Sequence, residues 1–521
     1  MSRRPRRPPA RAGAREWAAL AVLGVPAVLV MMNMSVLYLA LPRLSSDLEP
    51  DGAELLWIMD VYGFTVAGFL ITMGALGDRL GHRRVLLLGA AAFAGASVLA
   101  AYSTGAGALI AARAVQGVAA AAMAPSSLGV IRGLFTHPAQ RARAITIWTM
   151  AFMGGGALGP IVGGALLQYF RWGSVFLVSV PAMVVLLVCA PFLVPPSRGS
   201  GAGLPDPASV VMSLAAPLTL VYGVKGLASD GPGTASLGSV AAGLLIGAAF
   251  VRRQRRLSAP LVDPALFRNP AFAVPVAGMT VVGALLFGTT LLTSQYLQLV
   301  VGLEPLAAGL WQAPTAVVGT LTALVASGLV PRVHPAVPMG AGAALAVAGP
   351  VLFVLADGGP GLVVAGSVAL FAGLSPFMAL GTGLVVGAAP RERSGAASAI
   401  SETGAELGGA LGIAVLGGVA TAVYGARVRD RMPEGVPGDL ARSAGETLPA
   451  ALTAAERLPG DLGGALVETA RSAFVHSLHV HALVLVPLLA VLAVVTLTVL
   501  RREPEPAPPQ GRDTAPGTVG D

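Results

Sequence analysis

The chain has 521 residues, of which 55% are hydrophobic and only 12% are charged, and its mean hydropathy is +0.76. A soluble domain carries about 25% charged residues, so this chain lacks the polar surface needed to cover a globule in water. Its apolar residues come in long runs separated by short basic or Gly/Pro clusters. This pattern is typical of an α-helical protein that crosses a membrane many times.

The formal net charge of +8 does not indicate nucleic-acid binding, because the arginines sit in short loops between apolar runs. Positive loops fit the cytoplasmic side of a membrane. Cys189 is the only cysteine, which excludes an internal disulfide and a thiolate metal cluster. Its place in an apolar run indicates a packing residue.

The N-terminus is basic and rich in proline. The apolar run that follows is too long for a secretory signal and has no convincing small-residue cleavage site. We therefore expect a basic cytoplasmic tail over residues 1–16 and a retained first helix. Residues 501–521 are expected to form a disordered cytoplasmic tail.

The apolar runs predict about 14 membrane spans. Their approximate bounds are 17–42, 55–76, 85–103, 106–134, 144–169, 173–194, 207–228, 234–251, 272–302, 306–330, 337–356, 361–389, 395–424 and 478–500. The seventh and eighth are interrupted by Pro217, Lys225 and a Gly-rich turn near Asp230.

The placement of arginine predicts the orientation of the chain. An even number of spans puts both ends on one side, and the loops on that side are rich in arginine. The short loops on the other side hold little beyond Arg43 and Arg171. Both termini are therefore expected in the cytoplasm. The long segment 425–476 then falls outside as a partly helical extracellular loop, since long loops are translocated largely regardless of charge.

The first predicted span contains Asn33 within the segment 31–42, with Met31, Met32 and Met34 around it. An amide is polar but cannot take up a proton. Methionine is flexible and polarisable and could line an adaptable pocket. The same methionines could equally fill an interface between helices.

The second span places Trp57, Asp60 and Phe64 on one helical face by their spacing. A carboxylate flanked by aromatic rings suits an organic cation, because the charge pairs with it and the ring faces add cation–π attraction. The alternative is an aspartate at the membrane interface beside a Trp/Tyr belt, which costs little.

A tight basic loop, residues 74–84, joins the second and third spans. Gly77 and Gly81 can take the backbone angles that a sharp turn needs. Asp78 lies where one helix ends and the next begins, so it can accept hydrogen bonds from a helix N-terminus. The basic residues that could pair with it, or with lipid phosphates, are Arg79, Arg83 and Arg84. The alternative is a hairpin whose charges merely keep the loop in water.

The fourth span carries Arg113, followed by Gln116 and Gly117 on the same face. A buried arginine in a membrane span is costly and is therefore a functional candidate. The alternative is a structural charge pair or an arginine that extends to the membrane surface.

The fifth span carries Gly155, Gly159 and Gly163 at i+4 spacing. Such a stripe lets a neighbouring helix approach closely. Pro160 removes a backbone donor and is expected to bend the helix. The stripe alone indicates helix packing and no particular function.

The thirteenth span holds Glu402 and Glu406 at i and i+4, on one face. Two carboxylates in a low-dielectric setting repel each other when both are ionised, so one is expected to hold and exchange a proton. The alternative is that the span starts later and both acids lie in cytoplasmic water.

Other kinds of site are not indicated. The sequence has no phosphate-binding loop, so ATP hydrolysis is not expected, and neither a cofactor nor a metal is predicted. His476, His479 and His481 cluster near the end of the predicted outside loop. They could bind a metal or sense pH, although a solvated loop edge is the simpler interpretation.

The basic loop resembles the G-x-L-a-D-r-x-G-r-k-x loop of the major facilitator superfamily of transporters. The matching positions are Gly74, Leu76, Asp78, Arg79, Gly81 and Arg83. The first span is similar to the l-D-x-T-i-V-N-v-A-L-P segment of the 14-span drug:proton antiporters, with Asn33 where that family usually has aspartate. The second span resembles the W-x-x-D-x-Y pattern of quaternary-ammonium-compound exporters.

The fourth and fifth spans add two further similarities. The former resembles the R-x-x-q-G motif, whose arginine is linked to proton transfer in the family. The latter resembles the antiporter motif G-x-x-x-G-P-x-x-G-G, which is associated with exporters. The resemblance implies an all-α fold with two six-helix bundles, residues 17–195 and 260–500, and a two-helix insert with its linkers over 196–259.

The resemblance implies a proton-coupled exporter of amphipathic, cationic drugs, acting as a monomer in a bacterial cytoplasmic membrane. One alternative is a dedicated exporter of a self-made antibiotic or other natural product, and another is a non-transporting membrane sensor. An enzyme is not expected. The residues expected to bind substrate are Asn33, Trp57, Asp60, Glu402 and Glu406. Those expected to couple protons are Asp60, Arg113, Glu402 and Glu406. Those expected to form a conformational gate are Gly74, Asp78, Arg79, Gly81 and Arg83. The antiporter motif is expected at Gly155, Gly159, Pro160 and Gly163.

Overall fold

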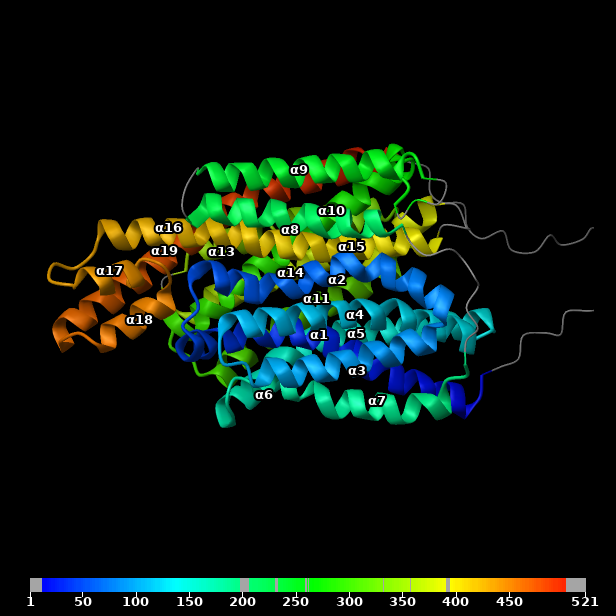
Figure 1. Ribbon diagram of the computed structural model, residues 1–521. Helices are drawn as coiled ribbons and strands as arrows, with labels where there is room; N and C mark the ends of the chain where they lie inside the picture. Colours follow the sequence, from blue (N-terminus) through cyan, green and yellow to red (C-terminus); the bar gives the residue numbers. More distant parts are fainter. Residues whose placement is uncertain are drawn as a thin grey trace, which may run out of the picture.

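The architecture is taken from a computed structural model. It describes residues 12–196, 206–229, 233–257, 260, 262–330, 332–356, 358–389 and 394–502. In these residues every regular element is a helix, and the long helices lie side by side in one bundle (Figure 1).

The chain order of the helices separates two halves. The first half consists of α1 (Ala14–Leu48), α2 (Gly52–Leu80), α3 (His82–Ala101), α4 (Ala106–Leu134), α5 (Pro138–Tyr169), α6 (Ser174–Leu177) and α7 (Ser179–Leu193). Two further helices follow, α8 (Pro207–Ser229) and α9 (Thr234–Gln254). The second half consists of η1 (Leu266–Arg268), α10 (Pro270–Gln295), η2 (Tyr296–Val300), α11 (Pro305–Leu329), α12 (Ala336–Leu345), α13 (Ala348–Val354), α14 (Pro360–Ala388), α15 (Ser394–Gly412), η4 (Ile413–Gly417), α16 (Gly418–Asp430), α19 (Gly460–Thr498) and η5 (Leu500–Arg502). We call the two short helices α17 (Gly438–Ala444) and α18 (Leu448–Glu456) the cap.

Eleven helices in the described part of the chain are long and apolar enough to cross a membrane. Three more helices pack among them: α2, α5 and α8, with 29, 32 and 23 residues. The fourteen spans predicted from the sequence are therefore consistent with the structure. The predicted seventh span is one continuous helix, α8, that runs through Pro217.

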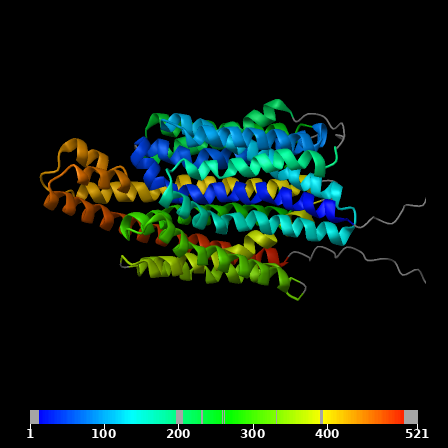
Figure 2. The same cartoon turned by 90° about the horizontal axis from the view of Figure 1, so that it is seen from below.

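The two halves repeat one packing pattern. In the first half α1 packs against α5, and α4 packs against both α2 and α3. In the second half α10 packs against α15, and α14 packs against both α11 and α12. Figure 2 shows the first half (blue to cyan) and most of the second half (lime to red) on opposite sides of the molecule. This repeat is visible only in the structure, because helix packing tolerates many apolar substitutions of similar volume.

Two helix pairs join the halves: α2 packs against α15, and α5 packs against α11. The additional helix α8 packs along α2 and α16 beside the first of these pairs, and α9 covers α8 (Figure 1). The helix α8 therefore lies against a seam between the halves and contacts both of them, and α9 packs on α8.

An ion pair joins the ends of α8 and α9 that lie away from the cap. Asp206 accepts hydrogen bonds from Arg253 at 2.6 Å (Nε) and 2.8 Å (Nη2). Arg253, and then Ser209, hold the pKa of the Asp206 carboxyl well below its ordinary value. The contribution of this ion pair to stability is therefore present at neutral pH and is lost only as the pH falls through that lowered pKa.

Residues 425–476, predicted as a long and only partly helical loop, are mostly helical. The helix α16 continues to Asp430, the cap follows, and α19 begins at Gly460, well before the start predicted for the last span at residue 478. Leu466, Ala470 and Phe474 are buried in this early part of α19. Because these residues are spaced four apart, they form one apolar stripe along the helix. Such a stripe stabilises a helix even where the mean hydropathy is too low to predict a membrane span.

The turn between α2 and α3 is tighter than predicted. Only Gly81 breaks the helix, with φ of 93°, a value that favours glycine. Gly77 lies within α2 with ordinary helical geometry, and the backbone of Asp78 belongs to the last turn of α2. The prediction that Gly77 also supplies turn geometry is therefore wrong, because one residue suffices to reverse the chain.

The glycine stripe of α5 faces α1. A Cβ added at Gly155 would overlap the carbonyl oxygen of Val28, and one at Gly163 would lie 2.9 Å from the side chain of Val36. Both pairs are separated by eight residues in their own helices, so α1 and α5 run side by side at close backbone distance. This is the close approach that the sequence predicts.

Another side of α5 faces α11 across the two halves. A Cβ at Gly309 would overlap the carbonyl of Pro160, and one at Gly164 would lie 2.7 Å from Cα of Leu306. Gly159 and Pro160 are both buried. The Gly–Pro segment therefore brings α5 close to α1 within the first half and close to α11 in the second.

Gly155→Ala tests this close approach against its neighbour Gly154→Ala. A Cβ at Gly154 meets nothing within 4 Å, so both substitutions gain the same helix propensity and only Gly155→Ala forces α1 and α5 apart. We expect Gly155→Ala to lower the free energy of unfolding by about 1–3 kcal/mol relative to Gly154→Ala. Thermal unfolding of the purified variants in detergent measures this difference. Equal stability of the two variants would show that α1 and α5 are not in close contact.

Candidate functional site

A buried cation forms the polar centre of the first half. The side chain of Arg113 on α4 is only 1% exposed. Its guanidinium donates to Oδ1 of Asn33 on α1 and, from Nε, to the carbonyl of Ile58 on α2 at 3.4 Å. The Cζ atom lies 4.6 Å from the centroid of the Tyr62 ring. Arg113 therefore ties α1, α2 and α4 together.

The partners of Arg113 in these contacts are all neutral. Asn33 is 3% exposed, and its Nδ2 is buried without a hydrogen-bond partner among the described residues. Tyr62 is fully buried, and its hydroxyl donates to the carbonyl of Val30 at 3.3 Å. A guanidinium held by an amide, a carbonyl and a ring face keeps its full positive charge. The sequence predicts Asn33 as a substrate contact, whereas the structure places it against Arg113.

The other two residues of the Arg113 motif hold helices together. Gln116 is buried and donates to the Ser97 hydroxyl on α3 at 2.9 Å. A Cβ at Gly117 would lie 2.5 Å from the carbonyl oxygen of Tyr62. Gly117 therefore allows α4 to approach α2 closely, which brings Arg113 within reach of Tyr62.

The acidic pair lies in the second half on α15, within a candidate span that covers Ile400–Asp430. Glu402 and Glu406 are partly buried and interact electrostatically with each other. The Oε2 atom of Glu406 is buried without a hydrogen-bond partner in the described part of the chain. Glu406 also lies within electrostatic range of Tyr62. A carboxyl of the second half thus acts electrostatically on the ring that covers Arg113 in the first.

The predicted aromatic face of α2 lies on the seam between the halves. The rings of Trp57 and Phe64 have centroids 6.3 Å apart. They pack with Ala410 of α15, Ala414 of η4 and Leu218 of α8. Trp57 therefore borders α15 and α8. The Asp60 side chain lies outside the part of the chain whose side chains are described, so its role stays a prediction.

The sequence-based interpretation noted Tyr62 only as the last residue of the W-x-x-D-x-Y pattern and gave it no role, although helical spacing points to one. Ile58, Tyr62 and Thr65 follow each other at i, i+4 and i+7 on α2, and all three meet α4. The helical spacing of the sequence pointed to Trp57 and Phe64 as cation-binding aromatic residues, because they flank Asp60. The opposite face of the same helix carries the ring that contacts the buried arginine.

The predicted gate lies at the end of α2 away from the cap. A Cβ at Gly74 would lie 3.7 Å from Pro125 of α4, and Gly81 forms the turn. Arg83 is partly buried in the first turn of α3. The side chains of Asp78 and Arg79 lie outside the described ones. The gating role of this loop therefore stays a prediction.

One of the three clustered histidines does not lie at the solvated loop edge that the sequence suggests. His481 is 2% exposed within α19, and its Nε2 lies 3.0 Å from the Thr289 hydroxyl of α10. The early start of α19 explains the difference, because it brings this histidine into the core of the second half. Among the described residues no group of three His, Cys, Asp or Glu side chains could hold a metal ion.

Known sequences resemble this chain over most of its length. A family model described as "Major Facilitator Superfamily" matches residues 25–413. The multidrug efflux pump LfrA of Mycolicibacterium smegmatis is 40% identical over 496 residues, which cover 94% of this chain and 98% of the relative. The methyl viologen resistance protein SmvA of Salmonella typhimurium is 34% identical over 469 residues, which cover 89% of this chain and 94% of the relative.

A solved structure shares the fold. The crystal structure of a bacterial homolog to the human lysosomal transporter Spinster, in an inward-facing and occupied conformation, has a TM-score of 0.68 and 17% sequence identity, and the similarity covers 95% of this chain and 100% of that chain. Together with the family model and the full-length relatives, it places this chain in the Major Facilitator Superfamily of membrane transporters.

Proposed function

We propose that this chain is a proton-coupled exporter of amphipathic, cationic compounds. Relatives named as a multidrug efflux pump and a methyl viologen resistance protein, similar over nearly their whole length, support export of such compounds. The observation that carries the coupling is the buried carboxyl of Glu406, whose Oε2 has no hydrogen-bond partner in the described residues. It lies near the Arg113–Tyr62 cluster of the opposite half.

Protonation of Glu406 changes the attraction between the halves. Because opposite charges attract, we propose that a carboxylate at this position draws the second half toward the positive charge of Arg113, whose ring partner Tyr62 lies within electrostatic range of Glu406. A protonated, neutral carboxyl loses that attraction. Because Tyr62 belongs to the first half and Glu406 to the second, binding or release of one proton favours one relative position of the halves over another.

A proton and an organic cation compete for the same carboxylate, and this competition sets the direction in which the two are exchanged. The ionised form of Glu406, with Glu402 one turn away, attracts an organic cation from the cytoplasm. A proton that enters from outside neutralises the carboxylate and releases the cation. One site that holds either a proton or a cation, but not both, exchanges the two across the membrane.

The neutral side chain of Asn33 supports the proposed role of Glu406. Where related exporters usually carry aspartate, the neutral amide of Asn33 accepts the hydrogen bond from Arg113. The arginine therefore keeps its net charge, and a carboxylate of the second half is available to balance it. An aspartate at this position would neutralise Arg113 within the first half.

The orientation is part of the proposal. We infer that the chain lies in the bacterial cytoplasmic membrane with both termini inside, supported by the arginine-rich loops on that side. The cap then lies outside. Residues 17–195 and 260–500 would act as the two moving halves, and 196–259 as an insert between them. The protein would act as a monomer, and the loop around Asp78 would act as a cytoplasmic gate.

Proton release from everted membrane vesicles tests the function as a whole. The panel contains lipophilic monocations, dications, neutral drugs and candidate antibiotics. We expect cations of several shapes to drive proton movement. Response to a single antibiotic would favour a dedicated natural-product exporter, and no response to any compound would favour a non-transporting sensor.

Glu406→Gln tests the proton site. An amide matches the shape of the carboxyl but cannot exchange a proton, so we expect cation-driven proton release to fall at least about tenfold, the scale set by losing one charge interaction of about 1.4 kcal/mol. Glu468→Gln is the matched control, because Glu468 lies on the exposed face of α19. Normal proton release by a well-expressed Glu406→Gln protein would remove Glu406 from the mechanism.

A double-mutant cycle tests the pairing of Asn33 with Arg113. Asn33→Asp offers the buried guanidinium a charged partner, so we expect it to raise thermal stability in detergent. In an Arg113→Met background the same change buries an unpaired carboxyl and should lower stability. The expected coupling is about 1–3 kcal/mol. Equal effects of Asn33→Asp in both backgrounds would show that residues 33 and 113 do not interact.

A further inference from the structure

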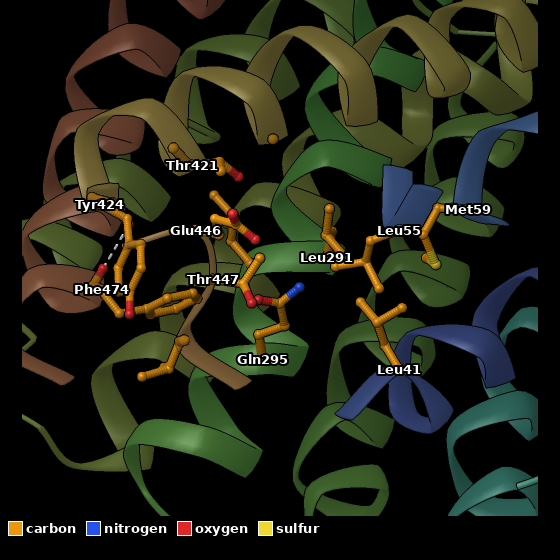
Figure 3. A pocket seen from close by; sticks show the side chains of 15 residues that line it. Leu41, Leu55, Met59, Leu291, Gln295, Thr421, Tyr424, Glu446, Thr447 and Phe474 are labelled. Atoms are coloured by element: carbon orange, nitrogen blue, oxygen red, sulfur yellow. Dashed lines mark hydrogen bonds between the residues drawn. The ribbon is translucent and has the colours of Figure 1, made fainter. Parts of the chain in front are cut away.

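A pocket lies between the two halves beneath the cap (Figure 3). Leu41 and Met59 line it from the first half, and Leu291 and Phe474 line it from the second. The cavity itself has a volume of about 50 Å³ and opens to solvent. The pocket is separate from the Arg113 and Glu406 cluster, whose residues do not line it.

One charged side chain lines this pocket, and the cap supplies it. Glu446 lies in the short connection between α17 and α18. Figure 3 shows Glu446 and Gln295 in the middle of the pocket, with Tyr424 and Phe474 on one side. In the described part of the chain the Glu446 carboxylate forms no ion pair, and the residue is exposed.

Hydrogen bonds to residues before and after Glu446 in the chain hold its backbone in place. Tyr424 of α16, which is 3% exposed, donates from its hydroxyl to the carbonyl of Ala444 at 3.0 Å. The Thr447 side chain accepts from the amide of Ala450 at 3.3 Å and caps α18. Ala444, two residues before Glu446, and Thr447, directly after it, are thus anchored, which restrains the backbone that carries the carboxylate.

The remaining lining suits the body of an amphipathic molecule. Leu41, Leu55 and Leu291 supply apolar surface, Met59 is adaptable in shape, and Phe474 offers an aromatic ring. A single carboxylate beside aromatic rings and apolar walls matches an organic cation that carries one positive charge.

We propose that this pocket is an exit site for amphipathic monocations, in which Glu446 of the cap pairs with the positive charge before release. The proposal rests on the proposed function, since it needs a cation to travel from the Glu406 region toward the cap. An exposed carboxylate attracts a cation only weakly and is screened by salt. Weak attraction at this point guides a leaving cation without retaining it.

Efflux of tetraphenylphosphonium from preloaded cells tests the site. We expect Glu446→Gln to lower the initial efflux rate about three- to tenfold in a medium of low ionic strength. The difference should shrink as external salt rises, because the Debye length falls to about 10 Å at 0.1 M. Glu446→Asp keeps the charge and should retain most of the rate.

Glu456→Gln is the matched control, because Glu456 is an exposed acid at the end of α18 that does not line the pocket. It should export the probe at the wild-type rate. If wild-type cells export the probe and Glu446→Gln equals wild type at low salt, the exit site is wrong and the proposed function stands. If the wild type moves none of the cations against their gradient, the proposed function fails and the exit site fails with it.

Discussion

The burial of one positive charge organises the first half of this transporter. A guanidinium removed from water is stable only when hydrogen-bond acceptors and polarisable groups replace its hydration. Arg113 meets this need with the Asn33 amide, the Ile58 carbonyl and the Tyr62 ring. These partners come from α1 and α2, so one side chain fixes three helices in register. Because all of these partners are neutral, the charge remains uncompensated within this cluster.

An uncompensated charge in one half has its greatest effect at the boundary with the other. Glu406 lies near Tyr62 across that boundary, and its charge depends on a proton. The two halves are in close backbone contact at glycines, for example Gly309 against Pro160 and Gly164 against Leu306. Closely packed interfaces shift between discrete arrangements instead of deforming gradually. A change of one charge at the seam is therefore suited to selecting between positions of rigid halves.

The elements outside the two six-helix halves lie where the halves meet. The helix α8 packs along α2 and α16 beside the contact of α2 with α15, α9 packs on α8, and the Arg253–Asp206 pair holds α8 and α9 to each other. At the other end the cap is anchored to α16 through Tyr424 and reaches the first half through the Arg457–Glu49 pair at 3.9 Å. Both of those side chains are largely exposed, so this ion pair is weak.

The amino-acid sequence by itself determined the features that depend on neighbours along the chain. The pattern of hydropathy predicted nearly all of the helices, and the spacing of residues predicted the glycine stripe of α5. The cost of burying a charge in a membrane span identified Arg113 as a functional candidate. Partners were decided only by tertiary structure: Asn33 lies 80 residues from the arginine that it binds, and Trp57 packs with Phe64 on the seam between the halves. The reason is that periodicity shows which residues share a face of a helix, whereas helix packing decides what each face meets. The same reason hid Glu446, which lines a pocket only because the cap is folded over both halves.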